Sequence, residues 1–468
     1  MDVNASGGLL RAANEQNGPN EPCNPNEQRG ANERKKSARQ KKTSASQKPR
    51  RRANKKTELP DPHDPHERPA DAHEQKDSDE QKGAAKQKES NEPKESREPG
   101  GILRWFKELQ DPRAHNIVHL FSDMLAIAIL AVICGAEGWA GVVVFAECRI
   151  EWLKTFLRLP KGIPSDDTFR RVFGAIKPEQ FERCFLNWTA HLAKHKSKLI
   201  AIDGKTLRRS FDAASGKEAI HMVSAWCKEN HLVLGQWTTE AKSNEITTIP
   251  QLLELLDLRG TIISIDAMGC QKTIAKKIVT DGGDYILHVK ENQPALLESV
   301  KLLFDEGLRD DCQGIRHATT HKTNKGHARL EGRTAWITSD LGALDAAGEW
   351  KGLRTVVRVR SVRQTSKGTR TTTDQYYISS LQGKTASDML ALIRSHWEIE
   401  NCLHWCLDVQ MSEDACRLRV GHAAENFSRL RRWALNLLKK DQTFKVGLKT
   451  KSKACCWSYD YLLKILTS

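Results

Sequence analysis

Apolar residues recur with a helical period over the segment that follows residue 101. One stripe is formed by Ile117, Leu120, Leu125, Ile129 and Ile133. Apolar positions three and four residues apart lie on one face of a helix, so the stripe predicts a buried helix. A second amphipathic segment covers 142–157, and Ser165 is suited to cap a third helix from Phe169 to Gly174. The segment 101–195 is therefore predicted to be a helical domain, which is typical of a DNA-binding module but equally compatible with a structural buttress.

The pattern changes at residue 198, where short apolar runs replace the helical stripes. The runs 199–202 and 261–265 predict two buried strands, and the runs 219–226 and 232–239 predict a hairpin with Asn230 in its turn. Further along, the predicted elements are helices at 250–256, 271–280 and 294–308 and a strand at 284–289. Strands followed by alternating helices and strands predict an α/β fold, a mixed sheet with helices packed on it.

The last third of the chain first becomes β-rich and then helical again. Runs of Thr and Val between 313 and 382 predict a strand-rich insertion. Helices are predicted from 386 to about 407 and from 423 to 440. Together these elements predict a catalytic domain over 196–440, followed by a basic C-terminal tail over 441–468.

Composition separates residues 1–100 from the rest. Every Trp, Phe and Tyr lies beyond residue 104, and the first hundred residues are mostly polar and charged. A segment that buries so little apolar surface is predicted to be a disordered tail, because burial cannot offset its ordering entropy. Residues 34–56 contain twelve Lys and Arg and no acid. This run is either a solvated surface or a sequence-independent contact with DNA phosphates, and we favour the second.

The net charge of +15 bears on the partner and the location of the protein. A basic body indicates a polyanionic partner, and double-stranded DNA is the commonest one. The start of the chain lacks the pattern of a secretory signal, and the longest apolar run, 125–136, is too short to span a bilayer. We therefore expect no membrane partner and a cytoplasmic, nucleoid-associated protein. The close pairs Cys402/Cys406 and Cys455/Cys456 lack a second pair at zinc-finger spacing, so a structural zinc site is disfavoured.

Two of the predicted strands end in the same chemistry. Ile202-Asp203-Gly204 and Ile265-Asp266-Ala267 each place an aspartate directly after a buried run. Functional groups of open sheets gather at the carboxyl ends of the strands, so these two carboxylates are expected to lie close together. Such like charges need a cation or a proton between them, and Mg²⁺ or Mn²⁺ prefers carboxylate oxygens. With a third carboxylate, the site would hold two metal ions about 3.5–4 Å apart, an arrangement suited to phosphodiester chemistry.

The third carboxylate is expected from the segment Arg394–Asn401. At helical spacing His396, Glu400 and His404 share one face. Glu398 points about 200° away from Glu400, so only one of the two can face the site. The histidines on this face are best explained by polar packing beside an active site.

The chain resembles the DDE transposases of bacterial insertion sequences, in the branch that includes the H-repeat-associated proteins. The motifs that carry the resemblance are Asp111-Pro112-Arg113, Gly135-Ala136-Glu137-Gly138-Trp139, Gly162-Ile163-Pro164-Ser165, Ile202-Asp203-Gly204-Lys205-Thr206-Leu207-Arg208, Lys242-Ser243-Asn244-Glu245-Ile246, Ile265-Asp266-Ala267-Met268-Gly269-Cys270-Gln271, Asn292-Gln293-Pro294, Tyr377-Ile378-Ser379-Ser380 and His396-Trp397 through Glu400-Asn401. They run in order over residues 101–465, and the tail lies outside them.

The resemblance implies an RNase H-like fold and a metal-dependent triad. It assigns Asp203, Asp266 and Glu400 as catalytic residues and metal ligands, with Mg²⁺ or Mn²⁺, two ions, as cofactor. The sequence departs from the family pattern at Glu398, Glu291 and Arg209, where a glycine is usual. Related insertion-sequence families carry a phosphate-binding Arg and Lys at fixed distances from the third acid, and this chain lacks both at those distances from Glu400. Arg394 or Lys205 is the suggested substitute for them. The family also implies a dimer or higher synaptic assembly on DNA.

Three functions remain compatible with the sequence. The first is a DNA transposase that cleaves and joins phosphodiester bonds at insertion-sequence ends. The second is a metal-dependent DNA nuclease on the same fold, without joining. The third is a catalytically silent relic that only binds DNA, and the presence of all three carboxylates argues against it.

Overall fold

A computed structural model gives the arrangement of most residues after position 100. It describes residues 101–115, 117–192, 198–211, 216, 218–239, 245–309, 317–326, 329–365 and 368–468, without the side chains of 317–326 and 329. The predicted tail over 1–100, the motif residues 242–244 and the first residues of the predicted insertion lie outside the described residues.

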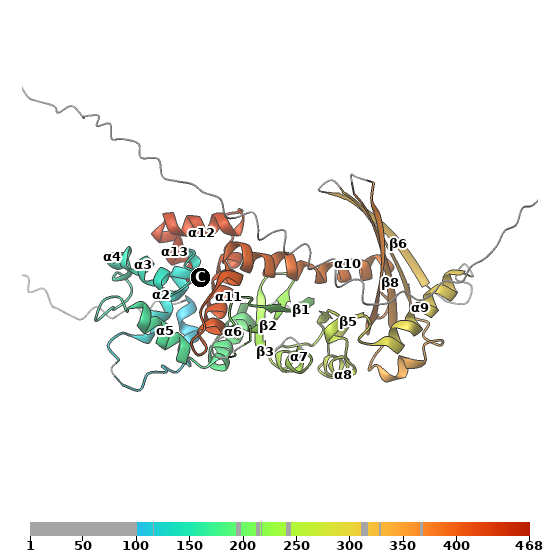
Figure 1. Cartoon of the computed structure of the whole chain (residues 1–468), viewed down its shortest axis with the longest axis horizontal. Helices are drawn as coiled ribbons and strands as arrows, with labels where there is room; N and C mark the ends of the chain where they lie inside the picture. Colours follow the sequence, from blue (N-terminus) through green and yellow to red (C-terminus); the bar gives the residue numbers. More distant parts are fainter. Residues whose placement is uncertain are drawn as a thin grey trace, which may run out of the picture. The chain divides into compact units, whose positions relative to one another are not determined.

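The described strands form a single sheet of nine strands, in the order β3-β2-β1-β4-β5-β9-β8-β7-β6 (Figure 1). Their bounds are β1 Leu199–Thr206, β2 His221–Cys227, β3 Val233–Thr239, β4 Ile262–Ile265, β5 Asp284–Val289, β6 His317–Gly326, β7 Arg329–Thr338, β8 Thr355–Thr365 and β9 Arg370–Ser379. The strands β1, β4 and β5 are mutually parallel, whereas β2 and β3 form the predicted antiparallel hairpin. This mixed sheet confirms the predicted α/β fold.

The β-rich insertion is confirmed, and it prolongs the sheet instead of forming a separate layer. Strand β9 pairs antiparallel with β5, and β8, β7 and β6 follow by antiparallel pairing. The strand β6 did not stand out in the sequence, because His317–Gly326 contains almost no apolar residues. Its place is fixed by ten backbone partners on β7.

Helices cover both faces of the sheet. Along β5, Tyr285 and Leu287 belong to the cluster that packs with α7, α8 and α9, while Ile286 packs with α10 on the other face. This alternation is the two-residue period of a strand buried on both sides. The helices are α7 Glu245–Glu254, α8 Lys272–Thr280, α9 Pro294–Arg309 and α10 Ala386–His396, and Figure 1 shows α10 opposite α7 and α8.

The N-terminal segment is helical, as expected. Its elements are η1 Gly101–Phe106, α2 Phe121–Ile133, α3 Trp139–Glu147, α4 Ile150–Leu153, α5 Asp166–Ala175 and α6 Pro178–Leu192. The predicted cap of α5 is present, since the Ser165 side chain accepts a hydrogen bond from the Thr168 amide at 3.2 Å. Every residue of α2 from Asp123 to Ile133 is buried, so this helix is the centre of a core and not a surface element.

The C-terminal segment completes that helical core. The helices α11 Ala423–Lys440, α12 Leu448–Trp457 and α13 Tyr459–Thr467 pack with α2, α6 and η1. The prediction of a basic tail over 441–468 is therefore wrong for its structure. Cys455, Leu462 and Ile465 are completely buried, because the few apolar residues of this basic segment recur at helical spacing and cover the core.

None of the helices in the described part of the chain combines the length and hydropathy needed to cross a bilayer. The cysteines that the structure describes form no disulfide.

Candidate active site

Two of the predicted acids lie side by side at the centre of the sheet. In the parallel pair β1–β4, Ile202 is the partner of Ile265, so the residues that follow them, Asp203 and Asp266, extend from neighbouring positions. The Asp203 Oδ1 accepts a hydrogen bond from the Gly204 amide at 2.9 Å, and the Asp266 Oδ1 accepts one from the Met268 amide at 3.1 Å. Each aspartate is thus oriented by a backbone amide of the residues that follow it.

Asp203, Asp266 and Glu400 line one pocket of about 130 Å³. The pocket is completed by Ser264, Ile265, Ile286, His288, Lys290, Tyr377, Ile393, His396 and Trp397. The structure thus brings together the three residues that the sequence singled out, although they come from β1, from the turn after β4 and from the segment after α10.

Glu400 is set apart from Glu398 by its position along the helix. The regular helix α10 ends at His396, and Glu400 opens a π-helical turn, η5, over Glu400–His404. Single π-helical turns occur frequently at functional sites, because the wider turn redirects side chains. Glu398 instead lies 3.9 Å from Lys228 and lines a different, adjacent groove. Of the two glutamates, only Glu400 lines the pocket with the aspartates.

The three carboxylates make the pocket electrostatically unfavourable when no cation is present. Burial, reinforced by the charges of Asp266 and Glu400, raises the pKa of Asp203 to about 8. Burial also raises the pKa of Asp266, and burial together with Asp266 raises that of Glu400. Oxygen ligands of this kind suit hard divalent cations, which would relieve the repulsion.

The donor set fits Mg²⁺ or Mn²⁺, but the described residues contain no three His, Cys, Asp or Glu side chains already gathered closely enough to surround one ion. Two aspartates on neighbouring strands can approach a cation with little backbone change. Glu400 comes from the segment that follows α10 and lines the same pocket.

The charge of Asp203 predicts a pH-dependent stability for the metal-free protein. Because its folded-state pKa is raised above the ordinary value of 3.8 to about 8, the stabilising protonated form is lost as pH rises through about 8. At pH 8.5 we expect Asp203→Asn to unfold at a higher temperature than wild type, which corresponds to an unfolding free energy larger by at least about 1 kcal/mol. Near pH 4 the two proteins should be equally stable. Thermal unfolding in EDTA at both pH values measures this; a difference that does not change with pH would contradict it.

Two histidines of the segment that carries Glu400 lie beside the acids in the neutral form. The His396 Nδ1 lies 3.1 Å from the Ser264 Oγ, and the His404 Nδ1 lies 3.5 Å from the Asp203 Oδ2. Burial lowers the pKa of His396 to about 4 and that of His404 to about 3. The structure agrees with the interpretation of these residues as polar packing around the acids.

Lys205 is not available as a phosphate-binding residue. Its ammonium group is buried and pairs with Asp408 at 2.6 Å and Asp414 at 2.9 Å. The suggestion from the sequence that Lys205 replaces the missing basic residue of the related signature is therefore wrong. Arg394 is exposed and lines the groove beside the pocket.

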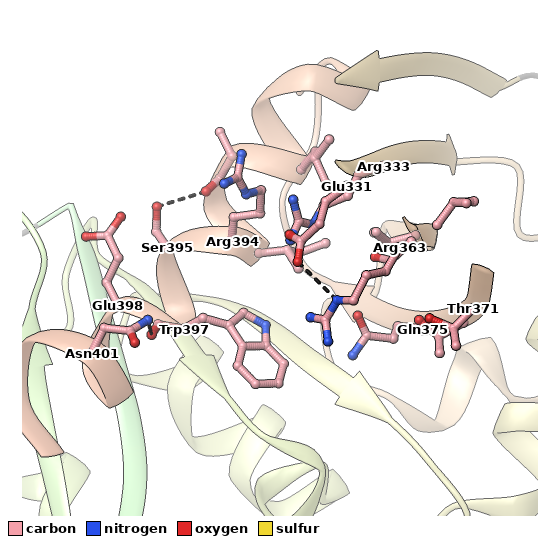
Figure 2. Close-up of a pocket in the computed structure, with 17 residues that line it drawn as sticks. Glu331, Arg333, Arg363, Thr371, Gln375, Arg394, Ser395, Trp397, Glu398 and Asn401 are labelled. Atoms are coloured by element: carbon pink, nitrogen blue, oxygen red, sulfur yellow. Dashed lines mark hydrogen bonds and ion pairs between the residues drawn. The ribbon is translucent and has the colours of Figure 1, made fainter. Parts of the chain in front are cut away.

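That groove has a volume of about 760 Å³ and lies between α10 and the strands β7, β8 and β9. Figure 2 shows Arg363, Glu331 and the Trp397 indole around it, and the Arg363 Nε donates to the Glu331 Oε1 at 3.1 Å. Trp397 lines both the groove and the acidic pocket. The two hollows are therefore neighbours along one surface.

Fold and site together define an RNase H-like α/β protein with an acidic centre at the ends of β1 and β4. Residues 194–437 match the model of the transposase DDE domain, and residues 103–189 match the domain described as DDE_Tnp_1-associated. The chain belongs to the DDE transposase family.

Individual relatives support this assignment over most of their length. The H repeat-associated putative transposase YhhI of Escherichia coli (strain K12) is 42% identical over 357 residues, which is 75% of this chain and 93% of the relative. The putative transposase YncI of Escherichia coli O157:H7 is 42% identical over 372 residues, 78% of this chain and 94% of the relative. A shorter relative from Escherichia coli (strain K12), 43% identical over 60 residues, is named the inactive transposase YbfQ; the match covers 13% of this chain and 71% of that protein.

Proposed function

We propose that this protein cleaves and joins DNA at the ends of an insertion sequence, with two Mg²⁺ or Mn²⁺ ions held by Asp203, Asp266 and Glu400. The observation that carries the proposal is the shared pocket of these three carboxylates within a transposase DDE domain. Bound metal ions would activate a water or a 3′-hydroxyl and stabilise the leaving oxygen of a phosphodiester. The chain supplies the carboxylates, with neutral histidines packed beside them.

The groove with Arg363, Arg394 and Trp397 is the proposed path of the DNA next to the pocket. Arginine guanidinium groups bind phosphate oxygens in a bidentate manner, and each phosphate neutralised adds to the salt dependence of binding. The helical unit and the strongly basic N-terminal run would add further contacts with DNA. Through its double-stranded DNA partner the protein would be nucleoid-associated, and bringing two element ends together would require a dimer or larger assembly.

Replacing Arg394 by Ala is expected to weaken DNA binding mainly through lost phosphate contact. The slope of log affinity against log salt concentration should decrease by about 0.9 for each contact removed. Fluorescence anisotropy with a labelled duplex at several salt concentrations measures the slope. Arg259→Ala is the matched control. Arg259 is exposed and lies just before the first residue of β4, whereas the acidic pocket lies after the last residue of that strand. Equal slopes for the two variants would remove Arg394 from the DNA path.

The position of Glu400 predicts different consequences for two neighbouring glutamates. Glu400→Gln should reduce metal-dependent cleavage on the order of a hundredfold or more, since a neutral amide is a poor ligand for a hard cation. Glu398→Gln should leave the cleavage rate at saturating DNA close to that of wild type, because Glu398 does not line the pocket with the aspartates. Its place in the adjacent groove should affect DNA affinity instead. Single-turnover cleavage at saturating Mn²⁺ compares them, and a larger loss in Glu398→Gln would reverse the assignment.

A strand-transfer assay tests the proposed function itself. The substrate is a pair of short duplexes that carry the inverted repeats flanking the coding region, with a supercoiled plasmid as target. A transposase produces joined products in Mg²⁺ or Mn²⁺. Cleavage without joined product would support the nuclease alternative, and DNA binding without cleavage would support the silent relic.

A further inference from the structure

Beside the strand end that carries Asp203 lies a further buried acid, Glu245, whose side chain pairs with His221. Glu245 is the first residue of α7, and His221 is the first residue of β2. The His221 Nε2 makes a short hydrogen bond to the Glu245 Oε1, and the His221 Nδ1 lies 2.9 Å from the Thr206 Oγ1. Both side chains are almost completely buried, with exposed fractions of 2% and 5%. The imidazole therefore links α7 to the end of β1 through both of its nitrogens.

The pair presses directly against the backbone that carries Asp203. A methyl group added at Gly204 would lie 2.3 Å from the His221 Nε2 and 2.5 Å from the Glu245 Oε1. No Cβ fits at such distances, so the absence of a side chain at Gly204 is what lets the pair reach the strand. Gly204 is also the residue whose amide donates to the Asp203 carboxylate. The contact thus falls on the peptide that orients this acid.

The charge of Glu245 acts on both aspartates of the pocket. Its charge adds to the burial that raises the pKa of Asp266, and it also contributes to the raised pKa of Asp203. Glu245 does not line the pocket. It is therefore a neighbour of the proposed ligands and not one of them.

We propose that His221 and Glu245 are positioning residues of the metal centre, which hold the Asp203–Gly204 backbone in place through the gap left by Gly204. This inference rests on the proposed metal-dependent function. Groups that orient metal ligands from behind typically change metal affinity or activity by about 10- to 100-fold when they are replaced. The role differs from general core packing, because it acts on one strand end next to one ligand.

The test uses three variants of the full chain and one matched control. Glu245→Gln retains the size of the side chain and removes its charge, His221→Gln keeps one donor, and Gly204→Ala displaces the pair without altering either partner. The control is Glu182→Gln. Glu182 is equally buried and paired, with the Arg429 Nε at 3.0 Å and the Gln236 amide at 2.9 Å, but its partners lie on α11 and β3 and not against Gly204.

Two readouts separate this inference from the proposed function. The first is Mn²⁺ binding by titration calorimetry without DNA, in which Glu245→Gln and Gly204→Ala should raise the dissociation constant by about 10-fold or more while Glu182→Gln leaves it unchanged. The second is amide hydrogen exchange of residues 199–206 in EDTA, which should quicken in the three variants relative to α2, but not in the control.

Each outcome decides one of the two ideas. Unchanged Mn²⁺ affinity and unchanged exchange in variants that are folded by circular dichroism would overturn the positioning role and leave the metal centre intact. Absence of Mn²⁺ binding in wild type would overturn the metal centre. The exchange measurement would then still decide whether the pair holds the end of β1. If the variants then exchanged the amides of residues 199–206 at the wild-type rate, the positioning role would be rejected as well.

Discussion

Asp203→Asn and Asp266→Asn are each expected to abolish metal-dependent DNA cleavage while leaving the protein folded. The loss should be at least about a thousandfold, because metal stabilisation of the transition state contributes several kcal/mol and each 1.36 kcal/mol changes the rate tenfold. The two aspartates extend from paired positions on β1 and β4 into the same pocket. Initial rates of end cleavage at saturating Mn²⁺ provide the measurement.

Binding to DNA should be retained in both variants, since the groove arginines are untouched. Asp167→Asn serves as the control: Asp167 lies on α5, is half exposed and pairs with Arg171 at 2.8 Å. It should cleave at the wild-type rate. If either active-site variant kept a rate near that of wild type, the assignment of that aspartate as a ligand would be wrong.

Replacing Glu413 by Ala is expected to cause a large loss of stability. Glu413 is completely buried, with the Arg432 Nη1 at 2.8 Å and the Ser428 Oγ at 2.7 Å, and the Lys205 Nζ lies 3.5 Å away. Removing it would leave two buried cations without this partner, which costs about 3–5 kcal/mol. Equilibrium urea unfolding at pH 7 gives the difference.

The pH dependence of this contribution has a definite sign. Burial alone would raise the pKa of Glu413, but the charges of Arg432, Lys205 and Arg431 outweigh it and lower the pKa to about 2. Its stabilisation is therefore complete above the ordinary value of 4.5 and is lost as pH falls toward about 2. The control is Glu151→Ala, because Glu151 is 81% exposed and pairs with Lys154, which is also exposed. This variant should cost less than about 1 kcal/mol. Similar costs for both variants would refute the role of the buried network.

The network also affects the site, because Lys205 lies two residues after Asp203 on β1. Successive residues of a strand alternate in direction, so Asp203 and Lys205 share one face. The ion pairs of Lys205 with Asp408, in a second π-helical turn η6 over Cys406–Gln410, and with Asp414 fasten the segment after Glu400 to that face. Contacts that stabilise the fold thus also hold the segment after Glu400 against the face of β1 that carries Asp203.

The sequence predicted the parts of the site that depend on local pattern. Short apolar runs that end in Asp203 and Asp266 indicate parallel strands, and the carboxyl ends of such strands meet at one edge. Helical phase correctly separated Glu400 from Glu398 in space, even though the segment changes from an α-helix to a π-helix at Glu400. The roles of these residues as ligands remain predictions.

What the sequence did not predict depends on contacts between distant segments. The pairing of His221 with Glu245, and of Lys205 with residues 408–414, joins positions whose separation carries no periodic signal. The strand β6 is polar and is defined by its neighbour, and the basic residues of 441–468 concealed two helices that cover the core. The polar and charged composition of these segments therefore did not predict their secondary structure, because contacts with distant parts of the chain decide where they pack.

The most direct test of the metal centre is anomalous X-ray diffraction from crystals of the full chain grown with Mn²⁺. Anomalous peaks are expected between the carboxylates of Asp203, Asp266 and Glu400, with no peak at Glu398, and the peaks should be lost in Asp203→Asn. Well-diffracting crystals with no Mn²⁺ peak in this pocket, or with Mn²⁺ bound only elsewhere, would contradict the proposed centre.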